Sequence, residues 1–270
     1  MNFKFKLGFI GFGNMATAIL SGVLQGGILS NDEIAIYDRN EIAVENAKKR
    51  NVFIANSNAD LVKSCEFVFF AVKPQAFDDV AKEIGESFSK DNKIISILAG
   101  TKISKFQKYF KNVAIARAMP NTPALIKCGM TGVDASMLEK NDAEFVLKLF
   151  NCVGDVIEIA EEQINDVIAI SGSGPAYAYL FIKGMVEKAL KLGFDDKTAK
   201  KLVLKTVIGS AKMFENSTEN IDILIDRVCS RGGTTIEAVK VFQNDGLIEL
   251  IDKAIQACYD RAVELSEDKE

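Results

Sequence analysis

Two glycines, and the helix that they introduce, are the residues best placed to bind a charged cofactor. Gly11 and Gly13 stand in the run Gly-Phe-Gly-Asn-Met-Ala, directly after the apolar residues 7–10. In a G-x-G-x-x-A turn the first glycine permits a tight bend and the second lets the backbone approach a pyrophosphate. Free N–H groups at the following helix N-terminus attract the phosphates. The pattern predicts a dinucleotide-binding βαβ unit, and a tight turn that binds nothing is the alternative.

The segment after this helix bears on which dinucleotide is bound. Residues 33–37 alternate like a strand and end at Asp38, Arg39 and Asn40. An acidic residue about 20 positions after the glycines holds a ribose hydroxyl of NAD, whereas a nearby arginine accommodates the 2′-phosphate of NADP. Asp38 therefore favours NAD and Arg39 favours NADP. Both are ordinary solvated residues at a strand end in the alternative interpretation.

A second glycine-rich segment also contains residue types suited to binding or catalysis. It reads Ser-Arg-Gly-Gly-Thr-Thr-Ile-Glu over residues 230–237. One interpretation is structural, because Thr234 and Glu237 form a T-x-x-E capping box that opens a helix. The other is functional, because exposed N–H groups in a glycine turn at a helix N-terminus bind small anions, including carboxylates. Thr235 adds a hydroxyl that donates or accepts a hydrogen bond. The residues alone leave both interpretations open.

The elements that must position these two turns differ between the halves of the chain. Apolar or alternating runs predict further strands at residues 67–72, 93–98, 113–119 and 155–159. The first three end in small or turn-forming residues, which leave room for a ligand at the carboxyl edge of a parallel sheet. After Glu161 helical spacing takes over, with long helices predicted at residues 176–192, 195–214 and 247–265.

These patterns predict an α/β protein with an N-terminal Rossmann-type doubly wound sheet and an all-helical C-terminal domain. We place the domains at residues 1–160 and 161–270. The 270 residues are sufficient for two domains, and 48% of them are hydrophobic. A glycine-rich stretch, residues 171–175, separates two helices, with Pro175 at the first position of the second helix.

Composition excludes several classes of function. The net charge of −4 gives no electrostatic footprint for nucleic acid or an anionic membrane, and no apolar run approaches the length of a membrane span. The five cysteines are scattered and form no C-x-x-C pair, which is typical of a reducing compartment rather than of a disulfide framework or zinc site. We expect a cytoplasmic protein that binds no nucleic acid, membrane or metal.

The absence of histidine narrows the chemistry further. With no histidine in the sequence, histidine general acid–base catalysis, Ser-His-Asp triads and histidine metal sites are all excluded. Any reaction must use a cofactor or the side chains of Lys, Glu, Asp, Tyr, Thr, Ser or Cys.

Ordered motifs along nearly the whole chain point to a known family. They are Gly-Phe-Ile-Gly-Phe-Gly-Asn-Met-Ala at 8–16, Ala-Val-Lys-Pro-Gln at 71–75, Met-Pro-Asn-Thr-Pro at 119–123, Ser-Gly-Ser-Gly-Pro-Ala-Tyr at 171–177 and Gly-Gly-Thr-Thr at 232–235. On these motifs the sequence resembles the pyrroline-5-carboxylate reductases of proline biosynthesis. The resemblance implies reduction of 1-pyrroline-5-carboxylate to L-proline by hydride transfer from NADPH, or from NADH. It also implies a helical domain that forms a homodimer, with dimers that assemble further, commonly into decamers.

The resemblance also assigns roles to individual residues. The implied cofactor-binding residues are Gly11, Gly13, Asn14 and Met15 at the pyrophosphate, Arg39 and Asn58 near the adenosine ribose, and Ala71, Val72, Lys73, Pro74 and Ala99 on the nicotinamide side. The implied substrate-binding residues are Glu162, Ser230, Gly233, Thr234 and Thr235. Thr235 is the implied catalytic residue, in contact with the ring nitrogen, and an imine that arrives already protonated is the alternative. Arg231 departs from the family, whose members usually have proline there.

Two other functions fit a Rossmann domain followed by helices. A β-hydroxyacid dehydrogenase carries a catalytic lysine on a helix after a G-x-G turn, with asparagine one turn later. Here Lys183 is followed by Gly184 and the asparagine is missing, which argues against that class. A non-catalytic dinucleotide sensor is the other alternative, and the second glycine turn disfavours it because a sensor needs no second anion site.

Overall fold

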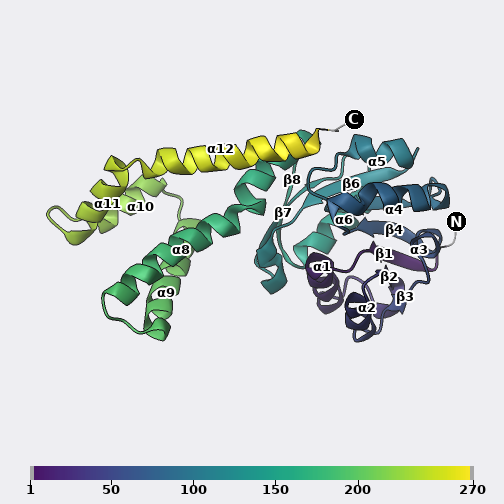
Figure 1. Cartoon of the computed structure of the whole chain (residues 1–270), viewed down its shortest axis with the longest axis horizontal. Coiled ribbons are helices and arrows are strands. Elements are labelled where there is room, and N and C mark those ends of the chain that lie inside the picture. The colour runs from purple at the N-terminus through teal and green to yellow at the C-terminus, as the bar shows by residue number, and fades with distance from the viewer. Residues whose placement is uncertain (1–2, 268–270) are drawn as a thin grey trace. The chain divides into compact units, whose positions relative to one another are not determined.

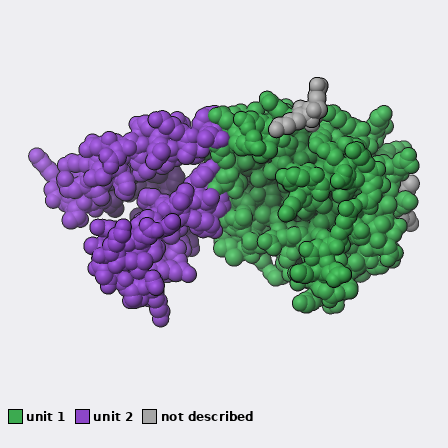
Figure 2. Space-filling view, in the orientation of Figure 1, with its two compact units in different colours: residues 1–173, 258–270 green, residues 174–257 purple. Residues whose placement is uncertain are grey.

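The chain divides into two compact units in a computed structural model that describes residues 3–267 (Figure 2). Unit 1 runs to Ser173 and takes in the chain again from Cys258, and unit 2 comprises Gly174 to Ala257. Unit 1 therefore contains the sheet and also the end of the last helix.

One eight-stranded sheet forms the centre of unit 1 among the residues that the structure describes (Figure 1). Its order is β3-β2-β1-β4-β5-β6-β7-β8, and the β6–β7 pair alone is antiparallel. The strands are β1 Phe5–Ile10, β2 Ile34–Tyr37, β3 Phe53–Ile54, β4 Cys65–Phe70, β5 Lys93–Ser96, β6 Ala114–Met119, β7 Gly129–Asp134 and β8 Gly154–Glu158. The chain order reverses between β1 and β4, and a crevice at the carboxyl ends of such strands is the usual ligand site.

Helices follow most of these strands and then make up unit 2. In unit 1 they are α1 Asn14–Gln25, α2 Glu41–Lys48, α3 Asn58–Ser64, α4 Phe77–Ile84, α5 Ile103–Tyr109, α6 Lys140–Asn151 and α7 Ile164–Val167. Short 3-10 turns are η1 Asn31–Glu33, η2 Pro74–Ala76, η3 Gly85–Ser87, η4 Thr122–Ile126 and η5 Glu161–Gln163, and η6 Ile168–Gly172 is a π-helix. Unit 2 holds α8 Gly174–Lys191, α9 Asp196–Glu215, α10 Ile221–Val228 and α11 Thr234–Asn244, and α12 Leu247–Ser266 runs from unit 2 into unit 1.

Strand β4 shows why the sheet is covered on both faces. Its residues alternate between two cores: Phe67 and Phe69 pack in the core that α1 and α6 complete, while Val68 and Phe70 pack in the core of α3, α4 and α5. All four side chains are fully buried, and each contributes roughly 1.5–3 kcal/mol by leaving water. A continuous apolar run is therefore the sequence of a strand that lies between two helical layers.

The predicted fold class is confirmed: a mostly parallel, Rossmann-type sheet is followed by helices. The sequence patterns do not predict β7, because Gly-Met-Thr-Gly-Val-Asp has neither a continuous apolar run nor a clean alternation. Residues 168–172 form the π-helix η6, and a new helix, α8, begins at Gly174 after a bend at Ser173. Pro175 is the second residue of α8, one position later than predicted. No helix among residues 3–267 is both long and apolar enough to cross a membrane.

Candidate active site

The first glycine turn is held tightly against the neighbouring strand. Gly11 has a φ of +86°, and a Cβ added to it would lie 2.9 Å from the carbonyl carbon and oxygen of Ala71. Its N–H donates to the Tyr37 carbonyl at 2.9 Å. Both the backbone conformation and the close approach therefore require glycine at this position.

Helix α1 begins directly after this turn with its N-terminal donors free of side-chain caps. Gly13 is the N-cap, no side chain caps it, and the first turn of α1 carries no acidic residue. A Cβ added to Gly13 would meet no protein atom within 4 Å, so the space beside the backbone is open. An uncapped helix end beside open space is suited to a phosphate.

A cavity of about 360 Å³ opens at this turn and brings together much of the predicted cofactor site. Of the predicted residues, Gly11, Gly13, Arg39, Asn58, Ala71, Val72 and Lys73 line it. Asn14 and Met15 are the first two residues of α1, Pro74 begins η2, and Ala99 lies in the loop after β5; these four lie outside the lining of that cavity.

Asp38 is bound to the backbone of the turns around it. Its Oδ2 accepts from the Phe12 N–H at 2.6 Å and its Oδ1 from the Asn40 N–H at 2.8 Å. Each carboxylate oxygen therefore holds a turn that borders the cavity, while each keeps lone pairs to spare. The fixed position of Asp38 is a structural role that its sequence position does not reveal.

Arg39 and Asn58 meet on a residue that the sequence patterns did not single out, Glu83 of α4. Arg39 Nη2 lies 2.9 Å from Glu83 Oε2, and Asn58 Nδ2 donates to both Glu83 oxygens at 3.2 Å. Asn58 is buried, and its Oδ1 has no partner among the described residues. Asn58 is one of the residues that line the cavity. The open space beside Gly13 and the uncapped N-terminus of α1 fit the phosphates of an NAD(P) cofactor.

Glu162 lies in unit 1, in the 3-10 turn after β8, where its neighbour is firmly held. Glu161 pairs with the buried Arg117 at 3.0 Å and accepts the Ile103 N–H at 2.7 Å. Burial lowers the pKa of Arg117, and the negative charge of Glu161 opposes this shift. Glu162 itself is exposed and lines a cavity of about 480 Å³ together with Asp134. The Glu161 anchor fixes the backbone that presents Glu162.

The other predicted substrate residues lie at the start of α11 in unit 2: Ser230 and Gly233 in the turn before it, and Thr234 and Thr235 as its first two residues. The predicted capping box is wrong: α11 begins at Thr234, Gly233 is its N-cap, and no side chain caps it. Glu237 instead pairs with Lys240 at 2.8 Å. The Gly233 N–H donates to the Ser230 carbonyl at 2.9 Å and closes the turn. Ser230 to Thr235 therefore end in an uncapped helix N-terminus, as Gly11 to Asn14 do in unit 1.

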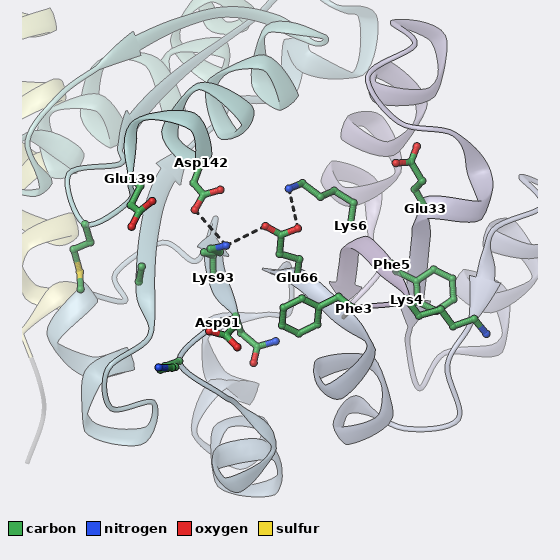
Figure 3. A pocket seen from close by; sticks show the side chains of 14 residues that line it. Phe3, Lys4, Phe5, Lys6, Glu33, Glu66, Asp91, Lys93, Glu139 and Asp142 are labelled. Carbon is green, nitrogen blue, oxygen red and sulfur yellow. Dashed lines mark hydrogen bonds and ion pairs between the residues drawn. The ribbon is translucent and has the colours of Figure 1, made fainter. Parts of the chain in front are cut away.

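A larger cavity, about 790 Å³, lies at the opposite edge of the sheet, at the amino ends of β1, β4 and β5 (Figure 3). Lys6 and Lys93 point toward Glu66 at 2.8 and 3.0 Å, and Lys93 also pairs with Asp142. Partial burial would raise the pKa of Glu66, but the hydrogen bonds from the two lysines lower it overall. These charged side chains already pair with one another, so the ion pairs hold the ends of the strands together. The cavity that they line is separate from the glycine turn.

Comparison with known proteins covers both units. A family model described as pyrroline-5-carboxylate reductase dimerisation matches residues 161–265, and one described as NADP oxidoreductase, coenzyme F420-dependent, matches residues 6–100. The pyrroline-5-carboxylate reductase of Escherichia coli strain K12 is 37% identical over 97% of this chain and 98% of its own. The chain belongs to the pyrroline-5-carboxylate reductase family.

Solved members of the pyrroline-5-carboxylate reductase family share the whole fold. The Plasmodium falciparum enzyme, solved with NADP bound, has a TM-score of 0.89 at 28% identity and covers 98% of this chain and 100% of its own. The Coxiella burnetii enzyme has a TM-score of 0.88 at 34% identity, with the same coverage. The motifs at the two glycine turns thus lie in a chain that is similar to these reductases from end to end.

Proposed function

We propose that this protein reduces 1-pyrroline-5-carboxylate to L-proline by hydride transfer from NADPH, with NADH as an alternative donor, in the last step of proline biosynthesis. The observation that carries the proposal is the near full-length similarity to pyrroline-5-carboxylate reductases. The open space beside the Gly13 backbone and the uncapped α1 agree with a dinucleotide enzyme.

The chemistry suits a protein without histidine. When bound, the dihydronicotinamide supplies the hydride, and the protein has to align the two rings and stabilise charge. We assign the pyrophosphate to Gly11, Gly13 and the α1 N-terminus, and the nicotinamide side to Ala71, Val72, Lys73, Pro74 and Ala99. Asn14 and Met15 supply N–H groups in the first turn of α1.

The substrate carboxylate is assigned to the turn before α11. Ser230, Gly233 and Thr234 surround an uncapped helix N-terminus, which attracts an anion. We assign Thr235 to the ring nitrogen, where its hydroxyl holds or relays a proton, and Glu162 to the substrate. The free N–H groups of α11, rather than a capping side chain, support this assignment.

The helical domain, residues 161–270, is assigned to a homodimer, with dimers assembling into a decamer. The dimerisation family model over residues 161–265 supports the homodimer. Unit 2 exposes many large apolar side chains, and those that line one groove of about 570 Å³ include Leu180, Phe181, Leu192, Phe194 and Phe242. Such a contiguous apolar surface is typical of an interface. Light scattering on a size-exclusion column measures the assembly, and a monomer would contradict it.

We assign the enzyme to the cytoplasm, because its cysteines are unpaired in the described chain. Cys65 is fully buried, and burial raises the pKa of its thiol to about 12. A thiol in that state stays protonated and unreactive.

The deciding experiment is oxidation of NADPH and NADH in parallel with 1-pyrroline-5-carboxylate as the acceptor. Turnover with L-proline as the product is expected. Cofactor binding without turnover on this imine, together with oxidation of 3-hydroxy acids, would instead identify a hydroxyacid dehydrogenase.

A further inference from the structure

We infer that Glu83 of α4 is a specificity-determining residue that weakens the enzyme's preference for NADPH over NADH. The inference rests on the proposed function, because it concerns how this site chooses its hydride donor. It starts from the contact between Glu83 and the arginine that follows β2.

An arginine at the end of the second strand is the group that receives the 2′-phosphate of NADPH in this fold. Here Arg39 Nη2 lies 2.9 Å from Glu83 Oε2, so this arginine already has a resident carboxylate. A phosphate bound by Arg39 has to share the guanidinium with that carboxylate. Because both are negative, Glu83 lowers the electrostatic gain on binding the phosphate.

The position of Glu83 is fixed by a buried neighbour. Asn58 Nδ2 donates to both Glu83 oxygens at 3.2 Å, and the Asn58 side chain is buried within the cavity lining. Glu83 also lies on the face of α4 that carries Val80, a lining residue one turn earlier. The carboxylate therefore stays beside the adenosine end of the cavity.

The other acid near Arg39 plays a different part. Asp38 accepts the N–H groups of Phe12 and Asn40, so its oxygens are bound to the backbone. Glu83 pairs with side chains, and its negative charge interacts with Arg39, the one arginine among the described residues that line the cavity. Among the described lining residues Lys73 is the other cation, and it lies on the nicotinamide side of the assignment above.

Replacing Glu83 with glutamine removes the negative charge and keeps an oxygen that accepts from Arg39 and Asn58. NADH lacks the 2′-phosphate and carries only the more distant pyrophosphate charge, so its binding is less sensitive to this charge. The ratio of the NADH dissociation constant to the NADPH dissociation constant is therefore expected to rise roughly three- to tenfold in Glu83→Gln.

The measurement is a fluorescence titration of NADPH and NADH with the full-length protein, which reads binding without turnover. Glu86→Gln is the matched control, because it makes the same change in net charge at an exposed residue. The hydrogen bonds and ion pair of Arg39 and Asn58 described above go to Glu83 and not to Glu86. The ratio in Glu86→Gln is expected to stay at the wild-type value. The gain in Glu83→Gln is also expected to shrink between 10 mM and 0.5 M salt, roughly a drop in Debye length from 30 to 4 Å.

An unchanged ratio in Glu83→Gln would overturn the inference. A lower ratio would overturn it as well, and would make Glu83 a support that aims Arg39 at the phosphate. Because the titration needs no 1-pyrroline-5-carboxylate, failure of the proposed reaction would leave this test intact, and failure of this test would leave the reaction untouched.

Discussion

The two glycine turns share one local design and differ in what surrounds them. Each places glycine as the N-cap of a helix without a side-chain cap, Gly13 before α1 and Gly233 before α11. Helix α1 buries six residues, including Ile19 and Val23, whereas α11 buries none within the described chain. Packing fixes the first turn, while the second depends on its own backbone.

This difference in packing separates the turn assigned to the dinucleotide from the turn assigned to the substrate. The dinucleotide turn belongs to the buried sheet domain and is preformed by neighbouring strands. The turn assigned to the substrate stands on a helical unit whose apolar surface we assign to a second copy. Changes at the first turn should therefore disturb folding and cofactor together, and changes at the second should disturb the reaction more than the fold.

Gly11→Ala tests the packed turn and has the largest expected effect. The new Cβ would lie 2.9 Å from Ala71 backbone atoms, at a φ of +86°. We expect the free energy of unfolding to fall by about 2–3 kcal/mol and NADPH binding to weaken by about tenfold or more. Urea unfolding and NADPH titration measure these, and a variant with wild-type stability would contradict the packing argument.

Thr235→Ala tests the exposed turn. Loss of the hydroxyl is expected to lower kcat/KM for 1-pyrroline-5-carboxylate by about 10- to 100-fold, because a hydrogen bond or proton route at the ring nitrogen is removed. NADPH affinity should stay at its wild-type value. Thr235→Ser keeps the hydroxyl and is the control, and equal losses in both variants would point to packing of the methyl group.

Gly232→Ala compares the two turns directly. Its φ of +74° is as unusual as that of Gly11, yet its added Cβ would meet no protein atom within 4 Å. Only the cost of placing alanine at a positive φ remains, so we expect the free energy of unfolding to fall by about 1 kcal/mol. If Gly232→Ala and Gly11→Ala cost the same, the close contact with Ala71 contributes little.

Glu237→Gln has the smallest expected effect. Glu237 forms an exposed pair with Lys240, and such pairs contribute about 0.5 kcal/mol or less. Loss of a capping box would cost about 1 kcal/mol. Thermal unfolding of Lys240→Gln, measured alongside Glu237→Gln, distinguishes an ion pair from a capping box. Only the ion pair predicts that both variants lose the same stability.

Sequence patterns predicted the parts of the fold that local physics determines. Continuous apolar runs such as 67–70 mark a strand covered on both faces, and the glycine turn at Gly11 is set by φ and close packing. The two-residue strand β3 and the glycine-containing β7 carry no such pattern. They exist because neighbouring strands offer hydrogen bonds, which no short window of sequence reveals.

The site was less predictable than the fold, for the same reason. T-x-x-E at residues 234–237 matches a capping box, but Gly233 takes the cap position and leaves Thr234 inside the helix. Glu83 has no local signal, since its meaning comes from residues 25 and 44 positions away along the chain. Only the fold brings Arg39, Asn58 and Glu83 together.

The route of α12 has a consequence for the order in which the protein is made. Residues from Cys258 onward belong to unit 1: Cys258 Sγ lies 3.2 Å from Ser173 Oγ, and Asn165 Nδ2 donates to Ser266 Oγ at 3.2 Å. On the ribosome, the sheet domain thus waits for the whole of unit 2 to be synthesised before its last helix can dock. At roughly 5–20 residues per second this is a delay of several seconds. During that interval the nascent sheet lacks the Leu265 backbone that packs against Gly100.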